Sequence, residues 1–157
     1  MRLGLLLALP LLAAACTTAV PGRRHAAFWR TNGYDGQGEQ QGRWRTYYDE
    51  DTRQRPYTRG RFRHGRPVGH WRYYNQPGYL DHEERYRKDY SDITFYYPNG
   101  QVARRGRAQV VDEHPNIHYF WFGDWQEFAD SGQLLRVDTY EHGRLTGTKE
   151  AAPQANK

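Results

Sequence analysis

Short runs of aromatic residues, many of them followed by a glycine turn, recur along most of the chain. No segment places apolar residues at i, i+3, i+4 and i+7 over three turns, so the pattern does not favour helices. Asn-Gly and Ser-Gly pairs between short aromatic or β-branched runs are hairpin signals, because glycine readily adopts the positive φ that such turns need. We therefore predict strands near 42–48, 57–63, 70–75, 79–87, 93–97, 101–110, 117–122, 125–129, 133–140 and 144–149.

The aromatic runs form a repeat. The copies are Trp44-Arg45-Thr46-Tyr47, Trp71-Arg72-Tyr73-Tyr74, Thr94-Phe95-Tyr96-Tyr97 and Trp125-Gln126-Glu127-Phe128. Aligning the last residue of each copy gives spacings of 27, 23 and 31 residues. Glycine turns follow the last three copies, at Gly78, Gly100 and Gly132.

These units resemble the variant MORN repeat, which runs Gly-x-x-x-Gly-x-Trp-x-x-Tyr-Tyr-x-x-Gly-x-Leu and then a strand ending in Tyr-x-x-Gly. One unit matches at Gly65, Gly69, Trp71, Tyr74, Gly78, Leu80 and Tyr86. A second matches at Tyr97, Gly100 and Val102 and carries Thr94 in place of the tryptophan. A third matches at Trp125, Phe128, Gly132, Leu134, Tyr140 and Gly143, and Gly42, Trp44 and Tyr47 begin a degenerate first unit.

The resemblance covers residues 42–150 and implies an all-β fold, an open antiparallel β-meander of repeated hairpins without a closed barrel. It also implies a non-catalytic role as a binding or scaffold surface. Many bacterial chains with this repeat carry antitoxin-like family labels, which imply capture of a toxic partner.

Composition changes the kind of core that we expect. Behind residue 15 the chain holds only 4 Leu, 2 Ile and 6 Val, whereas its 5 Trp, 13 Tyr and 6 Phe all lie there. Burying one ring removes about 150–250 Å² from water. We predict a thin core made of rings, and we exclude the large aliphatic core of a typical enzyme.

The amino terminus predicts export. Leu3 to Ala15 is an uncharged run behind Met1-Arg2. At 1.5 Å per residue it covers about 20 Å, less than the ~30 Å core of a bilayer, so it is typical of a signal peptide and not of a spanning helix. The chain then divides into a signal peptide at 1–15, a flexible tether at 16–41, the repeat domain at 42–150 and a disordered tail at 151–157.

The residues around position 16 resemble the bacterial lipobox, with Ala13 where leucine is favoured. This implies cleavage after Ala15 and acyl chains, palmitate among them, on Cys16, the single cysteine. Thr17 and Thr18 follow in place of aspartate, which implies delivery to the outer membrane, facing the periplasm. The alternative is an ordinary secreted protein.

Arginine dominates the charge. The formal net charge is +5, and 20 of the 23 basic residues are arginines interleaved with tyrosines. Such interleaving can bind nucleic acid, but an exported, lipid-tethered protein does not normally meet it, so we predict no nucleic-acid partner. Two interpretations remain. The guanidinium groups cover ring faces, or they give the protein a mild attraction to anionic lipid head groups.

Candidate catalytic groups are sparse, and we predict no enzyme, metal or cofactor. The serines behind residue 15 are Ser91 and Ser131, and neither lies in Gly-x-Ser-x-Gly. His64 and His142 occupy equivalent repeat positions, which favours a structural role over metal binding. The carboxylates Glu83-Glu84, Asp112-Glu113, Asp124 and Glu127 are interpreted as surface charge.

The densest aromatic run spans residues 119–125. Strand geometry sends Tyr119 and Trp121 to one face and Phe122 to the other. One interpretation is a partner-binding patch of Tyr119, Trp121, Phe122 and Trp125. The alternative is that one set packs against neighbouring repeats and the other against the tether or a loop.

We predict a membrane-anchored, non-catalytic lipoprotein that binds a protein or envelope partner through an aromatic and arginine-rich sheet surface. Two versions stay open. One is an immunity or antitoxin-type protein that neutralises a toxic effector, and the other is an envelope scaffold that contacts peptidoglycan or lipid. The oligomeric state is open as well.

Overall fold

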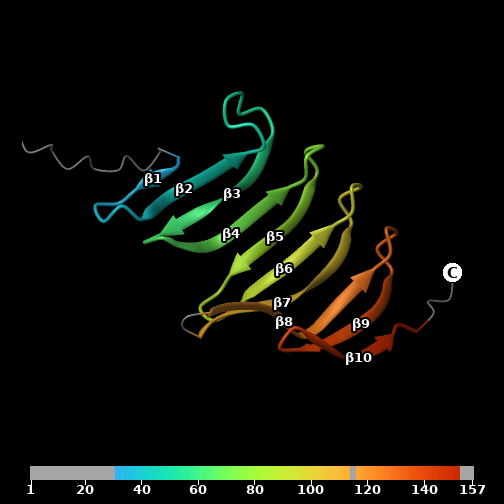
Figure 1. Ribbon diagram of the computed structural model, residues 1–157. Helices are drawn as coiled ribbons and strands as arrows, with labels where there is room; N and C mark the ends of the chain where they lie inside the picture. The colour runs from blue at the N-terminus through green and yellow to red at the C-terminus, as the bar shows by residue number, and fades with distance from the viewer. Residues whose placement is uncertain (1–30, 114–115, 153–157) are drawn as a thin grey trace, which may run out of the picture.

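The computed structural model describes residues 31–113 and 116–152, which form one ten-stranded antiparallel sheet (Figure 1). The order of the strands in the sheet is their order in the chain. The strands are β1 (Gly33–Tyr34), β2 (Gln40–Tyr47), β3 (Pro56–Arg63), β4 (Arg66–Tyr74), β5 (Leu80–Tyr86), β6 (Ser91–Tyr96), β7 (Val102–Glu113), β8 (Asn116–Phe128), β9 (Leu134–Glu141) and β10 (Arg144–Glu150). This confirms the predicted open all-β meander, since β1 and β10 lie at opposite ends and do not pair.

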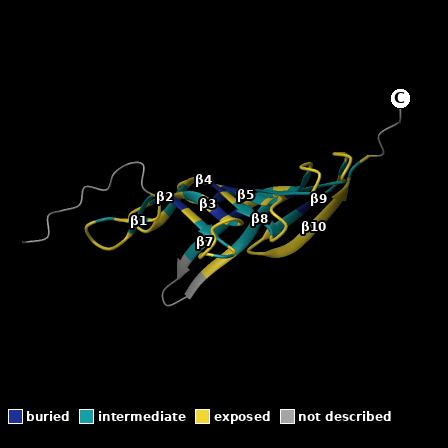
Figure 2. Cartoon of the chain, turned by 90° about the horizontal axis from the view of Figure 1, so that it is seen from above, coloured by how far each residue is buried: buried dark blue, intermediate teal, exposed yellow. Residues whose placement is uncertain are grey.

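The sheet is a single layer (Figure 2), and its two faces carry different side chains. Because side chains alternate along a strand, each strand sends one set to each face. The first set, which we call the aromatic face, includes Trp44, Phe62, Trp71, Tyr73, Phe95, Trp121, Trp125 and Tyr140. The opposite set, the arginine face, includes Arg43, Arg45, Arg59, Arg61, Arg72, Arg85, Arg105 and Arg107.

Ring-to-ring contacts connect the aromatic face from β1 to β6. Tyr34 meets Trp44 edge-on at 5.4 Å between ring centroids, and Phe62 lies 5.4 Å from Trp44 and 4.8 Å from Trp71. Tyr73 stacks on His82 at 4.2 Å, and His82 lies 5.0 Å from Phe95. Edge-to-face and offset contacts of this kind each add about 0.5–1.5 kcal/mol beyond the area that they bury.

The ring contacts continue from β6 to β9. Phe95 lies 6.3 Å from both Trp121 and Trp125. Trp121 stacks on Trp125 at 3.9 Å and meets Tyr140 edge-on at 5.4 Å. The core is thus the thin layer of rings that the composition predicts.

Two tryptophans lie flat over glycines of the neighbouring strand. The indole of Trp71 covers Gly60 and donates its Nε1–H to the carbonyl of Arg61 at 3.2 Å. Trp125 covers Gly106 in the same way, and its Nε1–H donates to the carbonyl of Arg107 at 3.1 Å. Each indole therefore buries its ring against backbone and also satisfies its one polar group.

A bulge two residues ahead of each of these tryptophans makes this placement possible. The pairing register shifts between Arg59 and Arg61 and again between Arg105 and Arg107. The extra residues lie on the strand that carries the tryptophan, β4 or β8, where Gly69 has φ 68° and Gly123 has φ 65°. Glycine is favoured at both points because other residues adopt a positive φ only at a cost.

The structure corrects the alignment of the second repeat. Tyr97 lies in a turn, where its N–H donates to the carbonyl of Gln101, as the N–H of Asn75 does to that of Tyr79. The equivalent of Tyr74 is therefore Tyr96, one residue earlier. Ile93, and not Thr94, stands at the tryptophan position, and it is 1% exposed. A buried aliphatic residue takes the place of the missing ring, and Thr94 points to the arginine face.

The other residues predicted to build the repeat lie at turns and pairing positions. Gly78, Gly100, Gly132 and Gly143 all have positive φ, as the predicted turns require. Leu80 pairs with Tyr74, and Leu134 pairs with Phe128, each beside a register shift. His64 and His142 have φ 47° and 48° and precede positive-φ glycines, which supports their interpretation as turn residues.

Two predicted boundaries are wrong. The segments 117–122 and 125–129 are parts of one strand, β8, because Gly123 forms a bulge and does not break the pairing. The segment 16–41, predicted as a tether, contains β1 and the turn into β2, closed by the N–H of Asp35 donating to the carbonyl of Glu39 at 2.8 Å. Residues 1–30, with the predicted signal peptide, Ala15 and Cys16, lie outside the described residues, as do residues 153–157 of the predicted tail.

The longest hairpin, β7–β8, bends out of the plane of the sheet (Figure 2). It accounts for the 31-residue spacing before the last repeat, which the repeat pattern alone leaves unexplained. The bend brings Tyr119 of β8 toward Tyr73 and Glu84, which belong to β4 and β5. No helix among the described residues has the length and apolar character to cross a bilayer.

We predict that Gly60→Ala and Gly106→Ala each destabilise the sheet. A Cβ at either position would overlap the indole of Trp71 or Trp125, and overpacking of this kind costs about 1–3 kcal/mol or more. The measurement is the free energy of unfolding, followed by tryptophan fluorescence in urea. Gly147→Ala, at a strand position where an added Cβ meets nothing within 4 Å, is the control. Equal unfolding midpoints for the three variants would contradict the assigned contacts.

Candidate functional site

The four residues of the predicted aromatic patch do not form one surface. Trp125 is 1% exposed and belongs to the core, with Trp121 stacked on it. Tyr119 lies on the same face and is 52% exposed. Phe122 points to the arginine face, where the guanidinium of Arg107 lies 5.2 Å from its ring centroid. Of the four, Tyr119 offers the most surface to a partner on the aromatic face.

A buried carboxylate lies beside Tyr119 on the aromatic face. Glu84 is 8% exposed and stands between Trp71 and Ile93 on the neighbouring strands. Burial and interaction with Glu84 raise the pKa of the Tyr86 and Tyr119 phenols. Burial raises the pKa of Tyr73 to about 12, and its hydroxyl lies 3.4 Å from that of Tyr86. Three phenols thus surround one carboxylate at the point where the bent hairpin meets the sheet.

On the opposite face, arginines stand directly across from one another. Arg43 pairs with Arg61, and Arg45 pairs with Arg59, which pairs in turn with Arg72 on β4. Like charges directly across an antiparallel pair are destabilising. No described carboxylate forms an ion pair with Arg43, Arg45, Arg59 or Arg61, whereas Arg72 donates to Glu83 at 2.8 Å.

This arginine cluster surrounds an open hollow of about 320 Å³ at Gly60. The side chains that project around it are Arg43, Arg45, Arg59, Arg61, His70 and Arg72. All six residues are exposed. The hollow lies on the arginine face, on the side of Gly60 opposite to the indole of Trp71.

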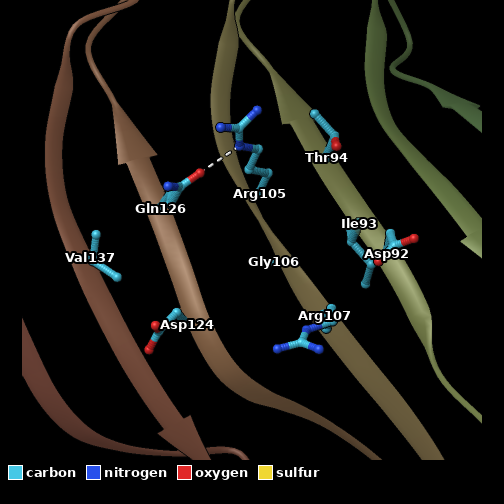
Figure 3. Close-up of a pocket in the computed structure, with 9 residues that line it drawn as sticks. All are labelled: Asp92, Ile93, Thr94, Arg105, Gly106, Arg107, Asp124, Gln126 and Val137. Atoms are coloured by element: carbon cyan, nitrogen blue, oxygen red, sulfur yellow. Dashed lines mark hydrogen bonds between the residues drawn. The ribbon is translucent and has the colours of Figure 1, made fainter.

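A second hollow of about 380 Å³ lies at Gly106 (Figure 3). It is the repeat copy of the first, because Gly106 pairs with Ile93 as Gly60 pairs with Trp44, and each glycine lies at a bulge beneath a tryptophan. The strand pairing makes Arg105 and Arg107 the equivalents of Arg59 and Arg61.

The two hollows differ in charge. Asp92 and Thr94 stand where the first hollow has Arg43 and Arg45, and Asp124 and Gln126 stand where it has His70 and Arg72. Figure 3 shows Asp92, Asp124 and Arg107 around Gly106, with Arg105 bonded to Gln126 at 2.6 Å. The second hollow therefore balances two arginines with two aspartates, while the first carries five arginines with only Glu83 at its border.

The turns at one end of β1 and β3 bring three possible metal ligands together. Ligand atoms of Asp35, Glu39 and His64 lie within 4.8 Å of one another. Hydrogen bonds from the backbone N–H groups of Glu39 and Gln37, and then contact with His64, lower the pKa of Asp35. Because this carboxylate closes the turn and contacts the His64 ring at 3.1 Å, turn packing accounts for the cluster.

Comparison with known proteins gives no match. No family model, curated protein or solved structure matches this chain. The resemblance to variant MORN repeats stays a prediction.

Sequence reasoning missed the arginine cluster as a site. The signal was the alternation Arg43-x-Arg45 and Arg59-x-Arg61 on two segments predicted as consecutive strands, which places the two arginines of each strand on one face. From the sequence we predict covering of ring faces, attraction to anionic head groups and an arginine-rich binding surface in general, without singling out these four residues. The covering of ring faces holds for Arg59 over Tyr74 at 5.7 Å, for Arg105 over Phe128 at 5.2 Å and for Arg107 over Phe122.

The raised tyrosine pKa values predict unfolding at alkaline pH. A phenol with a raised pKa stabilises the folded state fully below its usual value of 10, and this contribution is lost as the pH rises toward about 12, the value for Tyr73. We expect tyrosinate absorbance to rise together with loss of the folded signal in this window. Tyr73→Phe should move the midpoint to higher pH, whereas Tyr79→Phe, in an exposed turn, should not. A midpoint that Tyr73→Phe leaves in place would contradict this.

The arginine pairs predict a stabilising substitution. Arg61→Gln removes a charge that faces Arg43, so the free energy of unfolding at low salt should rise by about 0.2–1 kcal/mol. Added salt should shrink the gain, because it screens exposed charges. The matched control is Arg107→Gln, which removes a charge facing Asp92 and should destabilise the sheet. Urea titrations at two salt concentrations measure both, and a loss of stability in both variants would refute the repulsion.

Proposed function

We propose that this chain is a membrane-anchored, non-catalytic repeat lipoprotein of the bacterial envelope that binds a protein or envelope partner through its sheet. The observation that carries the proposal is the single layer, whose two broad faces present different chemistry. One face holds the exposed ring of Tyr119 beside a ladder of partly buried rings, and the other holds arginines without acidic partners among the described residues.

The energetics of the layer support a binding role. Exposed aromatic surface and unpaired arginines both gain free energy when a partner covers them, and tyrosine and arginine are enriched among residues that dominate interfaces. The sheet itself holds these groups rigidly, because the rings beneath them are packed from strand to strand. A partner therefore meets a preformed surface, which lowers the entropy cost of association.

The anchor is the second element of the proposal, and the lipobox-like residues up to Cys16 support it. The described sheet begins at β1, so fewer than 20 residues separate Cys16 from the first strand. A segment of that length keeps the domain close to the membrane to which its acyl chains would bind. The outer membrane, facing the periplasm, is the location that we propose.

The test is site-specific photocrosslinking in the producing cells. A crosslinking residue is placed at Tyr119, at Arg59 or, as a control, at Tyr79, which is 52% exposed in a turn. We expect the same partner to be captured from at least one face position and not from Tyr79, and its identity separates a toxic effector from a structural envelope component. Equal adducts from all three positions, or none, would contradict the proposal.

The anchor is tested in the same cells with Cys16→Ser. The expected result is a shift of the protein from the membrane fraction to the soluble periplasmic fraction, together with loss of the acyl mass. Unchanged fractionation would overturn the lipoprotein part of the proposal and leave the binding part intact.

A further inference from the structure

We infer that the hollow at Gly60 receives the carboxylates of an acidic, extended segment of the partner. This inference rests on the proposed function for the existence of a partner, and it adds the chemistry by which that partner is recognised. It is carried by the comparison of two hollows that one repeat builds twice in the same sheet.

The first step is that the charge at Gly60 is not required by the fold. The copy at Gly106 has the same bulge, the same glycine and the same covering tryptophan, yet it carries Asp92 and Asp124. The backbone therefore tolerates a neutral hollow. Five arginines around Gly60 add like-charge repulsion that the copy avoids.

The second step concerns what these arginines contact. No described residue forms an ion pair, side-chain hydrogen bond or ring contact with the guanidinium groups of Arg43 and Arg61, and the guanidinium of Arg59 lies over the ring of Tyr74. Arginine presents a fork of N–H donors that matches a carboxylate in a bidentate pair. The exposed guanidinium groups at Gly60 therefore hold donors that an acidic ligand can use without breaking an ion pair of the sheet.

The third step is spacing. Arg43 and Arg45 are alternate residues of β2, and Arg59 and Arg61 are alternate residues of β3. Alternate residues of a strand are roughly 6.6–6.8 Å apart, and neighbouring strands are about 4.8 Å apart. An extended peptide with Asp or Glu at every second position repeats its charges at the same interval.

Two features favour a protein segment over other anions. The hollow is open and its polar side chains are exposed, whereas sites for small molecules enclose most of the ligand. The same face carries Glu83, Asp92 and Asp124 farther along, and an anionic bilayer lying on the whole face would be repelled by them. Arginines beyond β4 on this face, Arg85, Arg105 and Arg107, stand near Asp92 or Asp124. The positive charge that no carboxylate offsets is therefore concentrated on β2–β4, which fits a narrow acidic segment.

The experiment uses the purified full chain in neutral detergent and a fluorescent peptide of alternating Glu and Thr, with a Gln-Thr peptide as its neutral counterpart. Binding is measured by fluorescence anisotropy at low and high salt. Arg59→Gln/Arg61→Gln should weaken binding of the acidic peptide by at least about tenfold, since charge-assisted pairs are lost. The matched variant Arg105→Gln/Arg107→Gln removes the same charge at the Gly106 hollow and should change it less than about twofold.

Circular dichroism and tryptophan fluorescence show whether each variant folds. Should the first double variant not fold, Arg43→Gln/Arg45→Gln removes the other arginine pair of the same hollow and must give the same loss. An equal loss in both hollows would overturn the inference, because it would show attraction to net charge alone. Stronger binding of phosphatidylglycerol vesicles, a thymidine oligonucleotide or inorganic phosphate than of the peptide would also overturn it.

The two proposals fail separately. If the acidic peptide does not bind but photocrosslinking still captures a partner, the inference about Gly60 falls and the proposed function stands. If the peptide binds at Gly60 while no partner is captured from either face, the proposed function falls and the acidic-ligand site stands.

Discussion

Contact between flat indole rings and bare backbone is the interaction on which the sheet depends. A single layer has no second layer to bury its side chains, so its apolar surface must be covered within the sheet itself. Trp71 over Gly60 and Trp125 over Gly106 achieve this, since the missing Cβ lets the ring lie against the strand. The indole N–H then donates to a backbone carbonyl, so the one polar group of each indole is not buried unpaired. The other rings extend this cover from β1 to β9.

Much of the fold was predictable because short sequence motifs specify its turns and its aromatic positions. The glycines at 78, 100 and 132 and the aromatic runs before them identified the hairpins and the open meander. The bulges were harder to predict. A glycine such as Gly123 is typical of the end of a strand, and only its pairing partners on β7 show that the strand continues through it. Ile93 was missed for a related reason: Tyr97 extends the aromatic run by one residue and shifts the alignment, although it lies in the turn.

The candidate site was less predictable than the fold. The sequence shows the alternation of arginines on two neighbouring strands, but the cross-strand register that places Arg43 against Arg61 depends on the β2–β3 turn and on the register shift between Thr46 and Tyr47. The aromatic run at 119–125 was predicted as one patch. The strand pairing places Phe122 on the arginine face, buries Trp125 in the core and leaves Tyr119 exposed on the aromatic face. A composition rich in arginine and tyrosine does not show whether a given arginine stacks on a ring or faces another arginine, whereas the strand register does.

The order of the strands has a consequence for how the molecule comes apart. Every extensive contact joins strands that are consecutive in the chain, so the sheet is close to a one-dimensional array in which each hairpin is held mainly by its neighbours. Such arrays lose structure from the ends. β10, with all seven residues exposed, lies at one of these ends, and its detachment would leave the indole layer over Gly60 untouched. Protease susceptibility and hydrogen exchange should thus be graded along the chain, and a chain shortened at its carboxyl end could retain the arginine cluster in a folded state.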